Sequence, residues 1–155
     1  MKAVESAMSE YRYTECGLDN VIIAGVSFMA DDSGDAVIRI PNVNGLHRAI
    51  ALGIVMRKAM MNGRDMRFLR SEMGMTQAEL AAMIHREPLT ISRWERAETE
   101  IDANAETLIR LHAIERLGLD VESGVSEISG WSIPSAVQHP ITIDGSDPNN
   151  YQLAA

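Results

Sequence analysis

The sequence has a single cysteine, few aromatic residues and no long apolar run. Aromatic residues make up only 5% of the 155 residues. Because just one residue is cysteine, the chain can form neither an internal disulfide nor a cysteine-rich zinc site. The longest apolar run without a charge, residues 49–56, is far shorter than the roughly 20 residues of a membrane-spanning helix. The first residues also lack the apolar core of a signal peptide. We therefore expect a soluble cytoplasmic protein with no membrane partner.

Basic residues are scarce and unevenly placed. The chain has 14 Lys and Arg against 22 Asp and Glu, a net charge of −8. Residues 57–96 hold eight basic and five acidic side chains, whereas residues 117–155 hold no basic residue. Net acidity argues against a protein that coats nucleic acid without sequence preference, because such binding requires excess cations. The Arg-rich middle fits either a face for phosphate and guanine or a solvated helical face.

The pattern of residues predicts an α+β chain in four parts. Residues 1–45 form a small β-containing region, with strands over 21–24, 26–28 and 36–40 and a hairpin turn over 31–35. Residues 46–61 form a linking or dimer helix, which is too apolar for one exposed face. That helix is either buried between the two halves or in contact with another subunit. Residues 62–117 form a helical domain, and residues 118–155, rich in Ser, Gly, Pro, Asn and Asp, form an acidic, flexible tail.

Capping signals mark the first two helices of the helical domain. Asn62 followed by Asp65 resembles a capping box, and the expected helix ends near residue 73, before Gly74. Thr76 followed by Glu79 is a full capping box that opens a helix to about residue 84.

Two further helices complete this domain. Glu87 offers an oxygen acceptor just before Pro88, which suits the first position of a helix ending near residue 96. The last helix covers residues 104–117 and closes at Gly118. Its apolar residues fall at three-residue steps: Leu108, Leu111, Ile114 and Leu117.

The helices over 76–84 and 87–96 have helix-turn-helix spacing. Ala81 is small where the second helix has to cross the first one closely. Ile91 and Trp94 lie three residues apart and are expected to pack back on the first helix. The outward face of the second helix then shows Pro88, Leu89, Thr90, Arg93 and Arg96.

This motif resembles the Xre, or Cro/CI-type, helix-turn-helix family. The resemblance rests on Met-Thr-Gln-Ala-Glu-Leu-Ala at 75–81 and Thr-Ile-Ser-Arg-Trp-Glu at 90–95. It implies an all-α, lambda-repressor-like domain, usually dimeric, whose second motif helix enters the major groove. It also implies a structural ion pair between Arg70 and Glu95. His85 stands at a turn position that is usually Gly, where φ is positive.

The resemblance carries specific roles for six DNA-binding residues. Gln77 matches a phosphate contact, and Thr90 and Arg96 stand where backbone contacts are common. Pro88 and Leu89 match the first exposed recognition positions, and Leu89 is placed to touch a thymine methyl. Arg93 matches a base-reading position and is suited to guanine O6 and N7. His85 is either a further phosphate contact or a tolerated turn residue.

A second resemblance involves residues 13–21 and 45–50 together with the helix-turn-helix. This arrangement is similar to the MqsA-like antitoxin and regulator group, in which the antitoxin has an N-terminal zinc ribbon. No ribbon site can form here, because Cys16 is the only cysteine.

From the sequence we expect a regulator that binds double-stranded DNA, as a homodimeric repressor on a palindromic operator. The alternative is the antitoxin of a type II toxin-antitoxin pair, in which residues 10–40 and 46–61 hold a toxin protein and the helix-turn-helix represses the shared operon.

No other pattern predicts a reactive centre. Nothing in the sequence fixes His47 as a base for Cys16, and the Asp residues near Gly34 do not have calcium-loop spacing. No two histidines have ligand spacing on one helix. We therefore expect no catalytic residue, no metal and no cofactor, and a protein that is not an enzyme.

Overall fold

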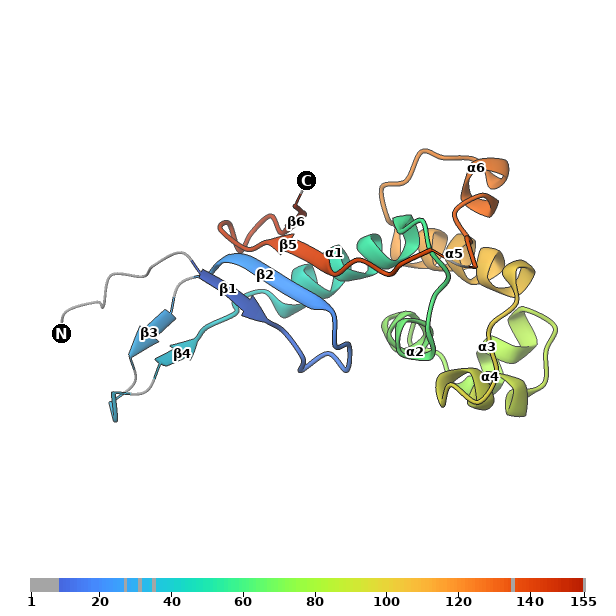
Figure 1. Ribbon diagram of the computed structural model, residues 1–155, viewed down its shortest axis with the longest axis horizontal. Helices are drawn as coiled ribbons and strands as arrows, with labels where there is room; N and C mark the ends of the chain where they lie inside the picture. The colour runs from blue at the N-terminus through green and yellow to red at the C-terminus, as the bar shows by residue number, and fades with distance from the viewer. Residues whose placement is uncertain (1–8, 27, 31, 35, 135, 155) are drawn as a thin grey trace. The chain divides into compact units, whose positions relative to one another are not determined.

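The computed structural model describes residues 9–26, 28–30, 32–34, 36–134 and 136–154 (Figure 1). Its elements are those of an α+β protein, with strands before and after a run of helices. The chain forms two compact units. The first consists of residues 1–50 and 140–155, and the second of residues 51–139.

A four-stranded sheet, in the order β1-β2-β5-β6, forms the centre of the first unit. Its strands are β1 (Ser9–Arg12), β2 (Val21–Val26), β5 (Ile141–Asp144) and β6 (Gln152–Leu153). β2 pairs antiparallel with β1 and parallel with β5, so that Val21 lies opposite Ile141 and Ile23 opposite Ile143. All four of these side chains are buried. The alternation of β-branched residues thus gives the sheet one core face.

A separate two-stranded sheet pairs β3 (Phe28–Ala30) with β4 (Ala36–Ile38) in antiparallel register. This pairing confirms the hairpin predicted around residues 31–35. Asp31 and Asp35 of the predicted turn, and Ser27 of the predicted strand over 26–28, lie outside the described residues.

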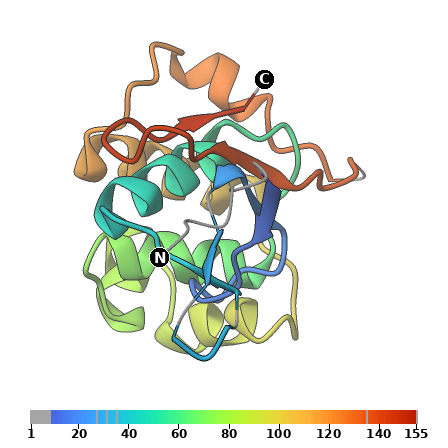
Figure 2. The same ribbon diagram turned by 90° about the vertical axis from the view of Figure 1, so that its left-hand side faces the viewer.

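Residues 118–155 differ from the predicted flexible tail. They contain α6 (Val125–Ser129) in the second unit and both β5 and β6 in the first. Ile128 and Trp131 are also buried. Figure 2 shows β5, in red, next to the blue strands with which it shares the sheet. β5 pairs with β6 nearby and with β2 far away in the sequence, and the composition of the tail alone does not reveal the distant partner.

α1 (Val43–Met56) is shorter at its C-terminal end than the predicted 46–61 helix. Its residues 43–50 belong to the first unit and residues 51–56 to the second. Leu46, Ile50 and Ile54 are fully buried within this single chain. Burial therefore accounts for the apolar character of this helix without a second subunit. No helix in the described part of the chain is long and apolar enough to span a membrane.

Four helices of the second unit follow the predicted starts closely. They are α2 (Gly63–Glu72), α3 (Gln77–Met83), α4 (Pro88–Glu95) and α5 (Ala103–Leu117). Both predicted capping boxes form, at Asn62 and at Thr76. Glu87 precedes Pro88 as predicted but makes no side-chain capping bond. Its side chain is longer than those of the residues that usually cap helices.

The fully buried residues of α5 are not those of the row Leu108, Leu111, Ile114 and Leu117. Ala105, Ile109 and Ala113 are buried, together with Glu106 and Arg110, whereas Leu108 is 39% exposed. Small residues allow close packing on this face, and its two charged residues neutralise each other.

Arg110 and Glu106 hold the segment that connects α1 to α2. Arg110 is fully buried and donates to Glu106 Oε1 at 2.7 and 3.1 Å. It also donates to three backbone carbonyls at 2.7–2.8 Å, those of Val55, Arg57 and Ala59. Glu106 accepts a further bond from the Met61 amide at 2.9 Å. A fully satisfied pair of this kind fixes the path of the chain into α2.

Candidate nucleic-acid interface

The turn between α3 and α4 has the left-handed conformation predicted at His85, with φ of 60°. Its backbone closes α3 through bonds from the His85 amide to the Ala82 carbonyl and from the Arg86 amide to the Ala81 carbonyl, at 3.4 and 2.8 Å. This is the 5→2 and 6→1 pattern that ends many helices. The usual turn geometry is therefore kept with His in place of Gly.

α4 is anchored on α3 by its inner face. Ile91 is fully buried and Trp94 is 4% exposed, while Leu80 and Ala81 of α3 are exposed by no more than 1%. These are the positions that the sequence pattern predicted to face inward. Ala81 is almost completely buried, and a longer side chain at such a position would have to displace its neighbours.

The expected ion pair between Arg70 and Glu95 forms with two parallel hydrogen bonds. Arg70 Nε and Nη2 donate to the two carboxylate oxygens of Glu95 at 2.7 and 2.9 Å. Arg70 Nη1 also donates to the Met75 carbonyl at 2.9 Å, and Gln77 Nε2 donates to Glu95 Oε1 at 3.2 Å. The cluster joins α2, the start of α3 and the end of α4. It fixes α4 from behind and leaves its outer face uncovered.

The predicted recognition residues lie on that outer face. Pro88, Leu89 and Arg93 are exposed, with Leu89 exposed by 54%, and Thr90 is half-buried. The Arg93 side chain makes no hydrogen bond or ion pair with any described residue, while its backbone carbonyl accepts from the Glu98 amide at 2.9 Å. Arg96 is exposed and its Nη2 lies 3.3 Å from a Glu98 oxygen. A weak surface pair of this kind yields readily to a stronger anion such as phosphate.

Gln77 differs from the other five predicted residues in its position. It begins α3, is partly buried and gives one side-chain N–H to Glu95. The structure thus brings five of the predicted residues together at α4, while Gln77 lies on the helix before it.

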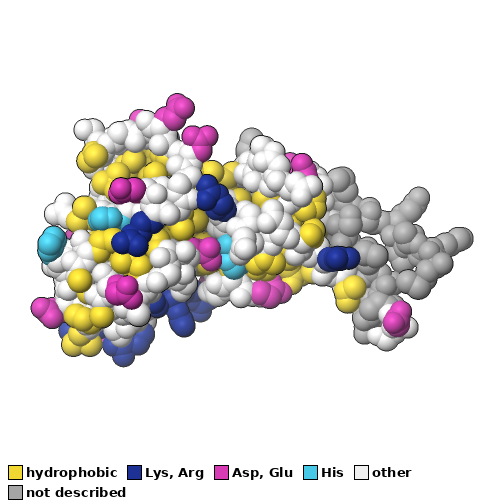
Figure 3. Space-filling model, turned by 180° about the vertical axis from the view of Figure 1, so that it is seen from behind, with side chains coloured by type: hydrophobic (Ala, Val, Ile, Leu, Met, Phe, Trp, Pro, Cys, Tyr) yellow, Lys and Arg dark blue, Asp and Glu magenta, His cyan; other side chains and the backbone are white. Residues whose placement is uncertain are grey.

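Two further arginines of the second unit are not among the six predicted contact residues. Arg86 lies over the Trp94 ring, 5.7 Å from its centroid, and pairs with Asp102 at 2.8 Å. On α2, Arg67 is exposed, and its side chain has no hydrogen-bond or ion-pair partner among the residues described. In Figure 3, dark blue side chains gather along the lower edge of the helical unit, where hydrophobic side chains also show. This mixture of cations and apolar side chains suits a surface that meets both phosphates and bases.

Cys16 and His47, considered above as a thiol and its base, each lie against Tyr13. His47 Nε2 lies 2.9 Å from the Tyr13 hydroxyl, and Cys16 Sγ lies 3.8 Å from the Tyr13 carbonyl. Within the described ranges, no three His, Cys, Asp or Glu residues gather where they could hold a metal ion.

Comparison with known protein families, with curated proteins and with solved structures finds no match to this chain. Function is therefore inferred from the geometry of α3 and α4.

Proposed function

We propose that this chain is a sequence-specific double-stranded DNA-binding regulator that acts as a dimeric repressor. The proposal rests on the exposure of the Arg93 side chain and on its lack of a partner in the described part of the chain. Its guanidinium is exposed and has no partner among the described residues, on a helix held from behind by Arg70 and Glu95. An arginine presented in this way can donate two hydrogen bonds to guanine O6 and N7 in the major groove.

The neighbours of Arg93 supply the other kinds of contact that DNA recognition needs. Leu89 offers an exposed apolar side chain to a thymine methyl. In this proposal Thr90, Arg96 and Gln77 contact phosphates, and such contacts set the register of the protein without reading sequence. Arg67, exposed on α2, adds a further cation. With a net charge of −8, the chain depends on these local contacts and has low non-specific affinity.

A two-fold dimer provides the specificity that one short helix lacks. Two copies of α4 would occupy half-sites about 34 Å apart, one turn of the DNA helix. The operator would then be a palindrome with the same spacing.

The first experiment is a footprint and gel shift on DNA upstream of the gene, at near-physiological salt. We expect protection of a palindrome by the wild-type chain and loss of protection with Arg93→Ala, because the guanine contact disappears. Arg116→Ala is the matched control, since Arg116 is exposed on α5 of the same unit. Equal binding of operator and scrambled DNA, or an unaffected Arg93→Ala variant, would overturn the proposal.

A second experiment separates phosphate contacts from base contacts. Arg67→Ala should weaken binding to operator and scrambled DNA alike and reduce the slope of log K against log salt by about 1. Arg93→Ala should weaken operator binding more than scrambled binding. A selective loss of operator binding with Arg67→Ala would place that residue at a base instead.

One observation favours the antitoxin as a second candidate function. The chain has a whole compact unit, residues 1–50 with 140–155, that contains none of the proposed DNA contacts. Such a unit is available for a partner protein, here a toxin encoded beside this gene. Capture of that protein by the Arg93→Ala full chain would support this function. The full chain is used as bait because β2 in the N-terminal segment pairs with β5 near the C-terminal end of the chain.

A further inference from the structure

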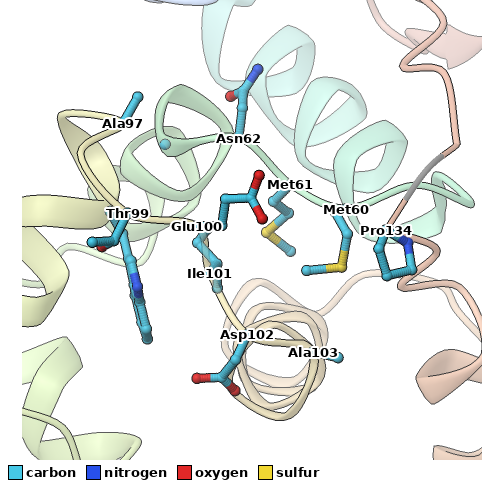
Figure 4. Close-up of a pocket in the computed structure, with 12 residues that line it drawn as sticks. Met60, Met61, Asn62, Ala97, Thr99, Glu100, Ile101, Asp102, Ala103 and Pro134 are labelled. Carbon is cyan, nitrogen blue, oxygen red and sulfur yellow. The ribbon is translucent and has the colours of Figure 1, made fainter.

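A cavity of about 500 Å³ lies within the second unit (Figure 4). Its wall comes from the segment before α2, the end of α4 and the start of α5, together with Pro134. Much of that wall is apolar, and it includes Met60, Met61, Trp94 and Ile101. The volume falls in the range typical of sites for small molecules, and an apolar wall with few polar groups is also typical.

The charged residues of the wall are both acidic. Glu100 and Asp102 line the cavity, and no Lys, Arg or His does. Asp102 is neutralised by Arg86 at 2.8 Å. Glu100 makes no hydrogen bond or ion pair with any residue that the structure describes. In Figure 4 its carboxylate points toward the space beside Asn62 and Met61, whereas the Asp102 carboxylate points away. One uncompensated negative charge therefore faces the cavity.

Two helices begin at the wall, and helix starts attract anions. Both starts are already capped by side chains of the chain itself. The Asp65 amide donates to the Asn62 side chain and the Ala105 amide to Asp102, each at 2.8 Å. A buried acid also stands in the first turn of each helix, Asp65 in α2 and Glu106 in α5. The helix starts are thus satisfied within the chain, and Glu100 determines the charge preference of the cavity.

We propose that this cavity binds a small organic cation with one ammonium group and an apolar body. The ammonium group pairs with Glu100, and the body lies against the Met60 and Met61 side chains and Trp94. Thioether groups are flexible and polarisable, and they pack well on aromatic or aliphatic ligands. This site is separate from the exposed face of α4, and its existence does not depend on the proposed DNA binding.

The test is calorimetric titration of the full chain with three probes of similar shape. These are 2-phenylethylamine, 2-phenylethanol and 3-phenylpropanoate, which carry a positive, a neutral and a negative group. We expect 1:1 binding of the amine with a Kd at or below about 1 mM. The alcohol should bind at least about fivefold more weakly, as expected from one partly solvated charge pair. No detectable amine binding, or equal binding of amine and carboxylate, would overturn the proposal.

Three variants locate the site. Glu100→Gln should reduce amine affinity to that of the alcohol and leave alcohol affinity unchanged. Glu98→Gln is the matched control, because Glu98 is a nearby exposed acid that does not line the cavity. Ala103→Phe fills the cavity from its wall and should abolish binding of both probes. Unchanged amine affinity in Glu100→Gln, or an equal loss in Glu98→Gln, would refute the assignment of the ammonium group to Glu100.

Discussion

Arg70 and Glu95 lie 25 residues apart in the chain, and their side chains meet through two parallel hydrogen bonds. The Arg70 side chain is 15% exposed and that of Glu95 only 5%. Removing one member of a largely buried pair leaves the other charge without a partner, which is costly. This contact links the stability of the second unit to the orientation of α4.

Arg70→Lys tests the geometry of this pair while keeping its charge. Lysine cannot reproduce two parallel bonds and the Met75 bond together, so the free energy of unfolding should fall by about 1–2 kcal/mol. Urea denaturation measures the change. Arg67→Lys, on the same helix but exposed, should change stability by less than about 0.5 kcal/mol. Equal stability of Arg70→Lys and the wild type would show that charge alone is sufficient.

Two helix ends have side chains in a backbone conformation that favours glycine. His85 after α3 and Ala97 after α4 have φ of 60° and 58°. His85→Gly and Ala97→Gly should each raise the free energy of unfolding by about 0.5–1 kcal/mol, because the left-handed strain outweighs the entropy that glycine adds to the unfolded chain.

Gly74 provides the reciprocal control for these two variants. Its φ is 68°, and a Cβ atom placed there would meet no other atom within 4 Å. Gly74→Ala should therefore lower the free energy of unfolding through backbone strain alone. A stabilising Gly74→Ala change would contradict this explanation of all three positions.

Asp65 should make the stability of the second unit depend on pH. Its side chain is fully buried and pairs with Arg57, and burial raises its pKa above the ordinary value of 3.8 despite that pair. Between 3.8 and the raised pKa the folded state holds the proton more strongly than the unfolded state. The contribution of this group to stability is therefore complete at lower pH and declines as pH rises through that interval.

Urea denaturation of the wild type and Asp65→Asn across pH 4–7 measures this contribution. The stability difference, wild type minus variant, should become less favourable to the wild type as pH rises. A difference that grows with pH would mean that the attraction to Arg57 outweighs burial and that the pKa is lowered.

Ile143 should be essential to the first unit. Its side chain is fully buried in β5, opposite Ile23 of β2. Ile143→Ala should cost about 2–5 kcal/mol, since it leaves a cavity in a small core. Hydrogen exchange of the β2 amides provides the measurement for this unit. Val137→Ala is the control, because Val137 is 74% exposed. Unaltered exchange in Ile143→Ala would show that β5 contributes little to the sheet.

Local signals predicted the helix-turn-helix region well. The capping boxes at Asn62 and Thr76 and the left-handed residues at His85 and Gly118 depend on neighbours within a few residues. Short-range chemistry of that kind can be recognised in a single sequence. The interior positions Ile91 and Trp94 followed from helical spacing alone.

Long-range relationships could not be predicted in the same way. The pairing of β5 with β2 depends on a partner strand far away in the sequence, and Ile141 and Ile143 stand in a segment rich in turn-forming residues. The buried Arg110 and Glu106 likewise resemble an ordinary solvent-exposed pair four residues apart on a helix. Their role depends on carbonyl groups of the segment before α2, which no local pattern reveals.

The parallel pairing of β2 with β5 also determines the order in which the chain can be assembled. β2 leaves the ribosome early, whereas β5 follows only after the whole of α2–α5 has been made. The helical segment can collapse on its own local contacts while β2 still has an open edge. Closing the sheet last requires joining two distant segments, which is a slow step that leaves a strand edge vulnerable to aggregation.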